Sequence, residues 1–372
     1  MYEYSHGGNA IFESGKANIV DLSANINPLG IPENVRTAII NAIQDCDRYP
    51  DNFSMELRRK TAEFEQIASP DWIFFGNGAS DIIFRLPLAV LSNKQTKKVM
   101  VAAPTFSDYE RSALSFGAEI IRHTLSVVNG FNMEDSFIQA VRKHKPNLVY
   151  LCNPNNPTGV ITEIGWIKEL LDCCQEIGAW LAVDECFLDF TEQYLECTSK
   201  VFLEEYPNLV ILKAFTKVFA LPGIRLGYAL CSNTALIEKL YFHGADWPVS
   251  NLAQSAGMAA LEGARDYIRR TIEYVSKERQ LLKKGLERIG YKVFESEADY
   301  VFFQNPYSFD LREELDKMGI RIRSCGNYFG LDNSYYRIAV SKAENNAKLL
   351  DAIAQVTKTR RKSDGSDFGD KN

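Results

Sequence analysis

The chain has 372 residues, of which 46% are hydrophobic and 24% charged, and its formal net charge is -6. Its size favours a globular subunit with two lobes over a small binding module, and its acidic balance gives no signature of nucleic-acid or anionic-membrane binding. The first residues lack a basic segment followed by an apolar run, and no segment approaches the roughly 20 apolar residues of a membrane span, so we expect a cytoplasmic protein. The eight cysteines show no C-x-x-C spacing, which predicts reduced, packed thiols and no metal site.

In the first two thirds of the chain, apolar segments rich in β-branched residues alternate with helical patterns. Such segments lie at 98–104, 147–154, 180–187, 209–215 and 225–230. This alternation is typical of an α/β lobe with a largely parallel sheet. The helical spacing of 164–178, which ends at Gly178, fits a crossover helix. We therefore predict one large lobe over residues 45–245.

The last third of the chain has a different pattern. From about Ala264 the apolar residues recur at helical spacing, which predicts a long connecting helix. Short strand-like and helical segments follow it, so residues 246–356 together with 1–44 are expected to form a smaller α+β lobe. Residues 357–372 contain one aromatic and no aliphatic residue, and we predict that they are disordered.

The segment LKAFTKVFALPGIRLGY at 212–228 carries the strongest chemical signal. Lys217 follows a buried apolar strand, and Arg225 lies eight residues later between two glycines. A lysine that forms a Schiff base needs an apolar setting in which its amine can be neutral. The planar fork of an arginine can hold a phosphate. Taken alone, the two residues could also be solvated loop charges.

This segment resembles the lysine motif of fold type I pyridoxal 5'-phosphate (PLP) enzymes in the histidinol-phosphate aminotransferase-like group. The resemblance extends to about residue 356, because the other motifs appear in the family's order. It implies an α/β fold with a large, mostly parallel lobe and a smaller α+β lobe. It also implies a PLP cofactor linked to Lys217, with Thr216 and Arg225 beside it, and a small-molecule substrate.

Two further motifs match the family's cofactor site. In GNGAS at 76–80, glycines before a helix let backbone amides approach an anion. The resemblance implies that Gly78, Ala79 and Ser80 hold the cofactor phosphate, although an ordinary strand-to-helix turn has the same composition. The heptapeptide NPNNPTG at 153–159 is rich in turn formers, and the resemblance implies that Asn156 bonds the cofactor's ring oxygen.

The DECF segment at 184–187 ends a buried apolar strand, where an unpaired carboxylate would be costly. The resemblance implies that Asp184 pairs with the pyridinium nitrogen and keeps the ring an electron sink. The alternative is an ordinary helix cap or surface acid. Phe187 stands where many relatives have a tyrosine. In APTFSDY, Phe106 is expected to stack on the cofactor ring, with a core phenylalanine as the alternative.

Two motifs point beyond the cofactor. Tyr49, in RYPD, matches a tyrosine that reaches the cofactor phosphate of a second subunit, which implies a homodimer. Arg337, in YYRIAV at 335–340, matches the arginine that binds the substrate's α-carboxylate. A strand arginine taken alone would more often be a charge at a sheet edge.

Within the group, the segments HGGN, SANINPLG and IRSCGNYFGLD resemble the threonine-phosphate decarboxylases of cobalamin biosynthesis. The resemblance implies decarboxylation of a phosphorylated amino acid, either L-threonine O-3-phosphate or L-serine phosphate. His6, Asn25 and Arg323 would bind the distal phosphate, while Lys217 and Arg337 face the amino-acid end. Asn156 is expected to contact the substrate as well. A histidinol-phosphate-type or other aminotransferase remains the alternative.

Two departures bear on this choice. Ala214 stands where many relatives have a hydroxyl residue at the phosphate, and Ser341 replaces an arginine common in the decarboxylases. The second departure weakens the assignment of the substrate but leaves that of the cofactor.

Overall fold

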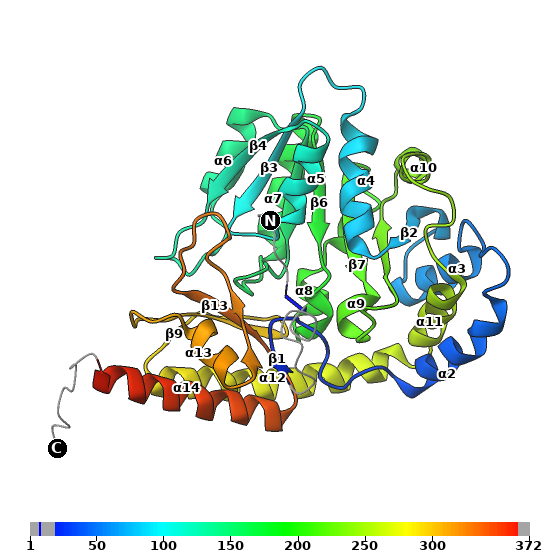
Figure 1. Cartoon of the computed structure of the whole chain (residues 1–372). Helices are drawn as coiled ribbons and strands as arrows, with labels where there is room; N and C mark the ends of the chain where they lie inside the picture. The colour runs from blue at the N-terminus through cyan, green and yellow to red at the C-terminus, as the bar shows by residue number, and fades with distance from the viewer. Residues whose placement is uncertain (1–6, 9–18, 364–372) are drawn as a thin grey trace.

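The computed structural model describes residues 7–8 and 19–363. Its large lobe is built on a seven-stranded sheet with the order β2-β8-β7-β6-β5-β3-β4 (Figure 1). β8 is antiparallel to β2 and β7, and the pairs from β7 to β4 are parallel. The largely parallel sheet is thus confirmed. The strands are β2 (Ile73–Asn77), β3 (Lys98–Ala103), β4 (Glu119–Thr124), β5 (Leu148–Cys152), β6 (Trp180–Asp184), β7 (Leu209–Ala214) and β8 (Leu226–Leu230).

Helices cover both faces of this sheet, because its central strands are apolar on both sides. One face packs against α4 (Ala79–Leu91), α5 (Asp108–Ser115) and α10 (Thr234–Phe242). The other packs against α6 (Asp135–His144) and α7 (Ile164–Glu176), which is the predicted crossover helix. Further helices are α2 (Glu33–Ala42), α3 (Met55–Glu65), α8 (Tyr194–Cys197), α9 (Phe215–Val218) and α11 (Asn251–Leu261), with the short turns η1 (Ile43–Asp45), η2 (Pro70–Trp72), η3 (Leu188–Phe190) and η4 (Ser199–Phe202).

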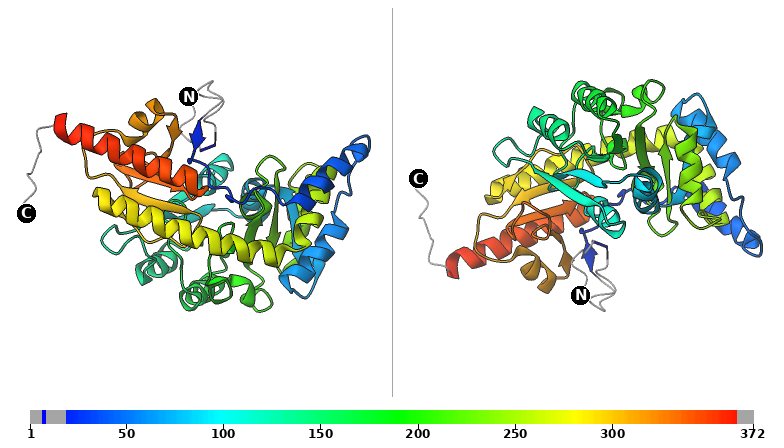
Figure 2. Two further views of the ribbon diagram at one scale, coloured as in Figure 1. Left: turned by 90° about the horizontal axis from the view of Figure 1, so that it is seen from below. Right: turned by 90° about the horizontal axis from the view of Figure 1, so that it is seen from above.

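A helix of 26 residues, α12 (Ala264–Ile289), runs beneath both parts of the molecule and confirms the predicted connector (Figure 2). It leads to an antiparallel sheet with the order β12-β13-β10-β9. The N-terminal strand β1 (Val20–Asp21) pairs in parallel with β11 (Ile320–Arg321). The other elements are β9 (Lys292–Val293), β10 (Tyr300–Gln304), α13 (Leu311–Lys317), β12 (Arg323–Ser324), β13 (Tyr335–Ala339) and α14 (Ala343–Ser363).

The prediction that disorder starts at residue 357 is wrong for 357–363, because α14 continues to Ser363. Thr357 is buried, and its hydroxyl lies 3.0 Å from that of Tyr291. A helix whose core contacts are already made can extend through polar residues at little cost, which composition alone does not reveal. Residues 364–372 lie outside the described part, and the division of the chain at 44/45 and 245/246 stays a prediction.

Two local features were not anticipated. The segment RIRS at 321–324 is interrupted at Ile322 and contributes to β11 and β12, which belong to different sheets. The edge strand β4 was not anticipated, because its half-exposed residues lack a long apolar run. All eight cysteines are free and seven are buried, as expected for packed thiols.

Within the described residues, no helix is long and apolar enough to cross a membrane. The same part of the chain contains no cluster of three His, Cys, Asp or Glu side chains that could hold a metal ion.

Candidate active site

A cavity of about 220 Å³ lies at the carboxyl ends of the central strands, between the large sheet and the smaller lobe. Parallel strands bring their carboxyl ends to one edge, which is where α/β proteins bind ligands. Twelve of the residues expected from sequence line the cavity: Asn25, Ala79, Ser80, Phe106, Asn156, Asp184, Phe187, Thr216, Lys217, Arg225, Arg323 and Arg337. Residues that lie far apart in the sequence therefore meet at one site.

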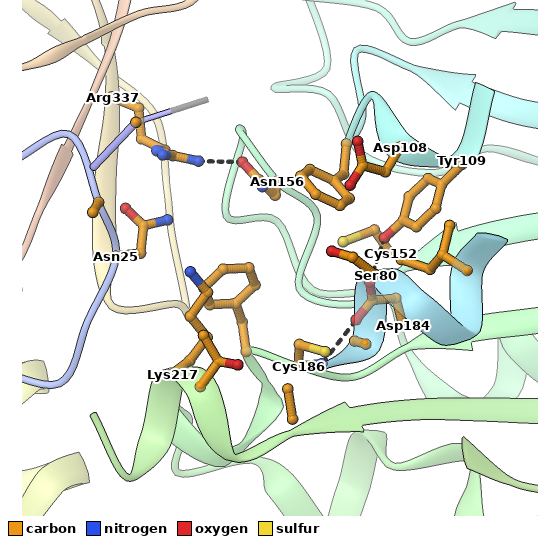
Figure 3. A pocket seen from close by; sticks show the side chains of 18 of the residues that line it. Asn25, Ser80, Asp108, Tyr109, Cys152, Asn156, Asp184, Cys186, Lys217 and Arg337 are labelled. Carbon is orange, nitrogen blue, oxygen red and sulfur yellow. Dashed lines mark hydrogen bonds between the residues drawn. The ribbon is translucent and has the colours of Figure 1, made fainter. Parts of the chain in front are cut away.

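Asp184 is the last residue of β6, and its carboxylate is held from two sides (Figure 3). The hydroxyl of Tyr109 donates to Oδ2 at 2.6 Å, and the backbone N–H of Cys186 donates to Oδ1 at 3.0 Å. Burial and the Asp184 charge hold the pKa of Tyr109 well above its usual range, so this phenol remains a donor. The carboxylate is thus fixed in orientation at the floor of the cavity.

Lys217 lies on α9, just beyond the end of β7, and its amine enters the cavity. Burial lowers the pKa of Lys217, and the positive charges of Arg337 and Arg225 lower it further, while Asp299 opposes them. Its Nζ lies 5.6 Å from the centre of the Phe187 ring. A lysine in such surroundings can supply a neutral, nucleophilic amine.

An anion cradle is formed where β2 turns into α4. Gly78 has φ +79°, and a Cβ there would lie 2.8 Å from Nη2 of Arg225. On β8, a Cβ at Gly227 would lie 2.4 Å from the backbone nitrogen of Ala79. Both glycines are therefore needed for the close approach of chain segments around the start of α4. The helix N-terminus and the Arg225 guanidinium together suit a phosphate group.

Arg337, on β13, is anchored by hydrogen bonds to Asn156 and to the carbonyl of Ser23, the latter at 2.9 Å. Because a guanidinium can only donate, Asn156 must turn Oδ1 toward Arg337. The Nδ2 group of Asn156 is then available as a donor to a ligand. Nε of Arg337 has no hydrogen-bond partner among the described residues.

A second buried cation lies beside the first. Arg323 on β12 is directly opposite Arg337 on β13, so both side chains are on the same face of the small sheet. Nη2 of Arg323 donates to Asn327 at 2.9 Å, and its guanidinium lies 5.6 Å from the ring centre of Tyr328. Oδ1 of Asn25 is buried without a partner in the described part of the chain, so it can accept a hydrogen bond from a ligand. The two guanidinium groups of Arg323 and Arg337 can donate to anionic groups on this side of the cavity.

The N-terminal segment also approaches the cavity. Gly7 lines it, and a Cβ at Gly7 would lie 2.2 Å from the carbonyl oxygen of Ser23. The backbone N–H of Gly8 donates to Oγ of Ser23 at 3.0 Å. His6 lies outside the described residues, so its role in binding phosphate stays a prediction.

Tyr49 does not belong to the residues that line this cavity. Its side chain is 78% exposed and stacks on Trp247, with 4.3 Å between the ring centres. This position neither tests nor contradicts the expectation that Tyr49 completes the site of a second subunit.

Sequence reasoning missed several residues of the cavity. Tyr109, Cys152, Cys186 and Tyr328 all line it. Tyr109 follows Phe106 by three residues and is fully buried. A buried tyrosine needs a partner for its hydroxyl, so the proximity of this residue to the cofactor motifs was the available signal.

A buried lysine of lowered pKa, an anion cradle and an oriented carboxylate around one cavity define a PLP-dependent enzyme of fold type I. The chain belongs to the family "Aminotransferase class I and II", whose model matches residues 17–353. PLP is accordingly the cofactor of this enzyme. The donor set fits that group, since the cradle suits its phosphate and Asp184 suits its ring nitrogen.

The relatives include two activities. The chain is 32% identical over 365 residues to a threonine-phosphate decarboxylase of Salmonella typhimurium, covering 96% of this chain and 97% of that protein. It is 30% identical over 338 residues to a histidinol-phosphate aminotransferase of Caldanaerobacter subterraneus subsp. tengcongensis, covering 90% and 92%. Among solved structures, the histidinol-phosphate aminotransferase of Clostridium acetobutylicum is 29% identical, with a TM-score of 0.84 over 92% of this chain and 100% of that one.

Proposed function

We propose that the protein decarboxylates a phosphorylated amino acid, with L-threonine O-3-phosphate as substrate and aminopropanol phosphate as product. The observation that carries this proposal is the pair of buried arginines, Arg323 and Arg337, side by side on the wall that faces Lys217. Such a substrate carries two anionic groups, a carboxylate and a phosphate. Each of the two guanidinium groups that line the cavity could donate a charge-assisted hydrogen bond to one of these anions.

For the cofactor, we assign the covalent link to Lys217 and the ring-nitrogen contact to Asp184. Phe106 and Phe187 would flank the ring, and Asn156 would donate from Nδ2 to its oxygen. The phosphate contacts would come from Gly78, Ala79, Ser80, Thr216 and Arg225, with Tyr49 from a second subunit. When bound, PLP supplies an electron sink for the bond that breaks at the substrate's α-carbon.

For the substrate, we assign the carboxylate to Arg337 and the distal phosphate to Arg323, Asn25 and His6. Holding both ends fixes the rotation about the bond between the α-carbon and the carboxylate. Orientation of this kind selects which bond breaks and can supply a large part of the rate. Lys217, close to the α-carbon, would return a proton to it after carbon dioxide leaves.

The second candidate is a histidinol-phosphate-type aminotransferase. The identity of 30% to such an enzyme and the structural similarity favour it as a rival. Its substrate also contains a phosphate, so Arg323 alone does not discriminate between the two. In a decarboxylase, the carboxylate that is lost would lie against Arg337. In an aminotransferase, the bond that breaks would be the one between the α-carbon and its hydrogen.

A substrate panel tests the choice. Purified protein with PLP is incubated with threonine phosphate and serine phosphate, and carbon dioxide is measured. In parallel, the protein is incubated with histidinol phosphate and 2-oxoglutarate, and the formation of glutamate is measured. We expect carbon dioxide from threonine phosphate at the highest kcat/KM. Serine phosphate lacks one methyl group, which corresponds to a difference of about 1 to 3 kcal/mol in transition-state binding, so its kcat/KM should be lower. Glutamate without carbon dioxide would establish the aminotransferase instead.

We also propose a homodimer. Exposed apolar side chains gather around η1 and the loop to α3: Ile43, Tyr49, Phe53 and Met55. A second copy would cover this apolar surface and bring Tyr49 to its own cavity. Mixed dimers of Tyr49→Phe and Lys217→Ala subunits should regain activity, since one of the two sites then has both residues. Absence of recovery in verified mixed dimers would rule out a shared site.

A further inference from the structure

Tyr328 lines the active-site cavity, but neither the cofactor assignment nor the substrate assignment uses it. It lies in the loop that joins β12 to β13 and is half-buried. A tyrosine in the wall of a cavity offers a ligand both an apolar ring and a polar hydroxyl. In this molecule the two ends of the side chain contact different residues of the site.

The ring of Tyr328 lies against one of the two cavity arginines. The guanidinium carbon of Arg323 is 5.6 Å from the ring centre, which is within the range of a cation–π interaction. The preceding residue, Asn327, accepts a hydrogen bond from Nη2 of Arg323 at 2.9 Å. Two consecutive residues of the loop therefore hold the Arg323 guanidinium.

The hydroxyl of Tyr328 lies beside the anchor of the other arginine. It is 3.5 Å from Oδ1 of Asn156, which is the same oxygen that accepts from Nη1 of Arg337. The phenol and the Arg337 guanidinium therefore meet at one atom. The side chain of Tyr328 thus extends from Arg323 to the residue that anchors Arg337.

The hydrogen bond from this hydroxyl to Asn156 is weak. A hydrogen bond between two oxygens is ordinarily about 2.5 to 3.0 Å long, so a distance of 3.5 Å leaves much of the donor's capacity unused. Loss of hydration raises the pKa of Tyr328, against the opposing charges of Arg337 and Arg323, so the hydroxyl keeps its proton. Nε of Arg337 also has no hydrogen-bond partner among the described residues. Two donors beside Asn156 can therefore serve a ligand.

The loop that carries Tyr328 is attached to both lobes. The backbone N–H of Tyr328 donates to the carbonyl of Cys325 at 3.0 Å, and the N–H of Cys325 donates to the carbonyl of Tyr335 on β13 at 2.8 Å. The ring centre of Phe329 lies 4.9 Å from the guanidinium carbon of Arg122, which belongs to β4 of the large sheet. The protein itself therefore places the Tyr328 hydroxyl at the cavity.

We propose that Tyr328 is a substrate-binding residue whose hydroxyl donates to the carboxylate held by Arg337, while its ring keeps Arg323 in place for the phosphate. This inference rests on the proposed function, which assigns the carboxylate to Arg337. A carboxylate oxygen accepts a shorter and stronger hydrogen bond than the neutral amide oxygen of Asn156. A ligand without a carboxylate would leave the hydroxyl in its weak bond.

The contact would make the cavity selective for ligands that carry both anionic groups. The substrate of the proposed reaction has a carboxylate and a phosphate, whereas its product and histidinol phosphate are phosphorylated amino alcohols without a carboxylate. Only the substrate would bind the Tyr328 hydroxyl. Tyr328 would therefore favour binding of the substrate, release of the product and exclusion of histidinol phosphate.

Two ligands that differ only in the carboxylate test this contact. 3-Phosphoglycerate carries both anionic groups, and in glycerol 3-phosphate a hydroxymethyl group replaces the carboxylate. Neither ligand has an amine that could link to the cofactor, so calorimetry measures their affinities for the PLP-loaded protein directly. We expect the wild type to prefer 3-phosphoglycerate.

Tyr328→Phe keeps the ring and removes the hydroxyl. This variant should lose about 10-fold or more of its affinity for 3-phosphoglycerate, whereas its affinity for glycerol 3-phosphate should change by less than about 2-fold. Equal losses for the two ligands, no loss for either, or a wild type that does not prefer 3-phosphoglycerate would each overturn the proposal.

Tyr300→Phe is the matched control. The ring of Tyr300 also lies beside a cavity arginine, 5.3 Å from the guanidinium carbon of Arg337. Its hydroxyl, however, donates to the backbone carbonyl of Asn155 at 2.8 Å, and the residue does not line the cavity. Its loss should leave the preference for 3-phosphoglycerate unchanged. The same loss of affinity in both variants would mean that packing around the arginines, and not a hydroxyl contact, sets the affinity.

A second change at position 328 strengthens the donor instead of removing it. 3-Fluorotyrosine, introduced at this position alone by stop-codon suppression, keeps the ring and the hydroxyl, while the fluorine makes the hydroxyl a stronger donor. At a pH at which this phenol is protonated, the preference for 3-phosphoglycerate over glycerol 3-phosphate should increase. An unchanged or smaller preference would refute the contact, even if Tyr328→Phe does not fold.

Failure of this inference can be distinguished from failure of the proposed function. Glutamate without carbon dioxide in the substrate panel would reject the decarboxylase, but the affinities of the two amine-free ligands would still decide whether Tyr328 binds a carboxylate. Conversely, carbon dioxide formation by Tyr328→Phe with the kcat/KM of the wild type for threonine phosphate would reject the role of Tyr328 and leave the decarboxylase in place.

Discussion

The two faces of the central strands differ although they carry similar residues. Asp184 and Ala214 line the cavity, whereas their sequence neighbours Glu185 and Lys213 do not. On the far face, Nζ of Lys213 lies 3.2 Å from Glu65 and 3.3 Å from Asp189. Its charge is thus matched by acids within the protein.

The acids of the far face are also satisfied. Glu185 accepts from Thr198 and from the N–H of Ser199 at 2.8 and 2.6 Å. Glu65 accepts from Lys200 at 2.9 Å and from the Tyr228 hydroxyl at 2.5 Å.

On the cavity face, by contrast, Arg337 Nε and Asn25 Oδ1 have no partners in the described part. Polar groups that are bonded within the protein are not available to a ligand, whereas these two atoms can each form a hydrogen bond with one.

The largest expected effect comes from removing the cavity's lysine. Lys217→Ala should lower turnover by roughly 10⁴-fold or more, since the group that forms the covalent link is lost. Its thermal unfolding should change little, because Lys217 makes no ion pair with the described acids within salt-bridge distance. Assays with excess PLP and calorimetry check both statements. Turnover like that of the wild type would contradict the assignment.

Removing the buried acid Glu65 on the far face should lower the stability of the fold. Burial alone would raise the pKa of Glu65, but Lys213, Lys200 and the Tyr228 hydroxyl outweigh it and lower the pKa to about 2 from 4.5. Glu65→Gln should cost about 3 to 5 kcal/mol of unfolding free energy, a factor of roughly 10² to 5 × 10³ in the folding equilibrium. Denaturant unfolding measures it, and Glu262→Gln, whose exposed side chain pairs with Lys60, is the control.

The same residue predicts a pH dependence. The folded-state pKa of Glu65 is depressed, so its contribution is fully present above the ordinary value of 4.5 and is lost as the pH falls toward 2. The wild type should lose up to about 3 kcal/mol through this group over that window. Glu65→Gln should lack this part of the acid sensitivity. Parallel stability curves of the two proteins between pH 5 and 3 would contradict the role of Glu65.

The sequence could predict the features that have a local pattern of residues, and it could not predict the buried ion pairs of the far face. Apolar runs and helical spacing predicted the large sheet, the α7 crossover and the α12 connector, because those patterns follow directly from burial. The motif residues around Lys217 were predicted by resemblance. Glu65 and Lys213 were not, since a buried ion pair between residues 148 positions apart has no local pattern.

The next effect is smaller and concerns the substrate. Arg323→Ala should lower kcat/KM for threonine phosphate by about 10- to 150-fold, the loss of a charge-assisted bond of roughly 1.5 to 3 kcal/mol. Threonine without its phosphate should be a poor substrate, with the same kcat/KM in the wild type and in Arg323→Ala. Arg321→Ala is the control, because this neighbouring arginine bonds Asp316 at 2.5 Å and does not line the cavity. Equal losses for the two substrates would exclude a phosphate contact.

The smallest effect tests how the cavity's carboxylate is held. Tyr109 donates to Asp184 at 2.6 Å and stacks on Tyr150, with 4.7 Å between the ring centres. Tyr109→Phe removes that hydrogen bond but keeps the ring, so Asp184 retains only the Cys186 amide to orient it. We expect kcat to fall about 10-fold, with cofactor affinity falling less, since the phosphate cradle is untouched.

Tyr150→Phe makes this test specific. The Tyr150 hydroxyl is buried like that of Tyr109, but it donates to the carbonyl of Ile83 at 3.3 Å instead of to Asp184. Losing it should change kcat by less than about 2-fold, since a long bond to a neutral group contributes little. If both variants lose the same activity, packing of the stacked rings matters and the hydrogen bond to Asp184 does not. A loss confined to Tyr109→Phe would mean that activity depends on the hydrogen bond from the Tyr109 hydroxyl to Asp184. The partner of this carboxylate oxygen is then supplied by the protein and not by a ligand.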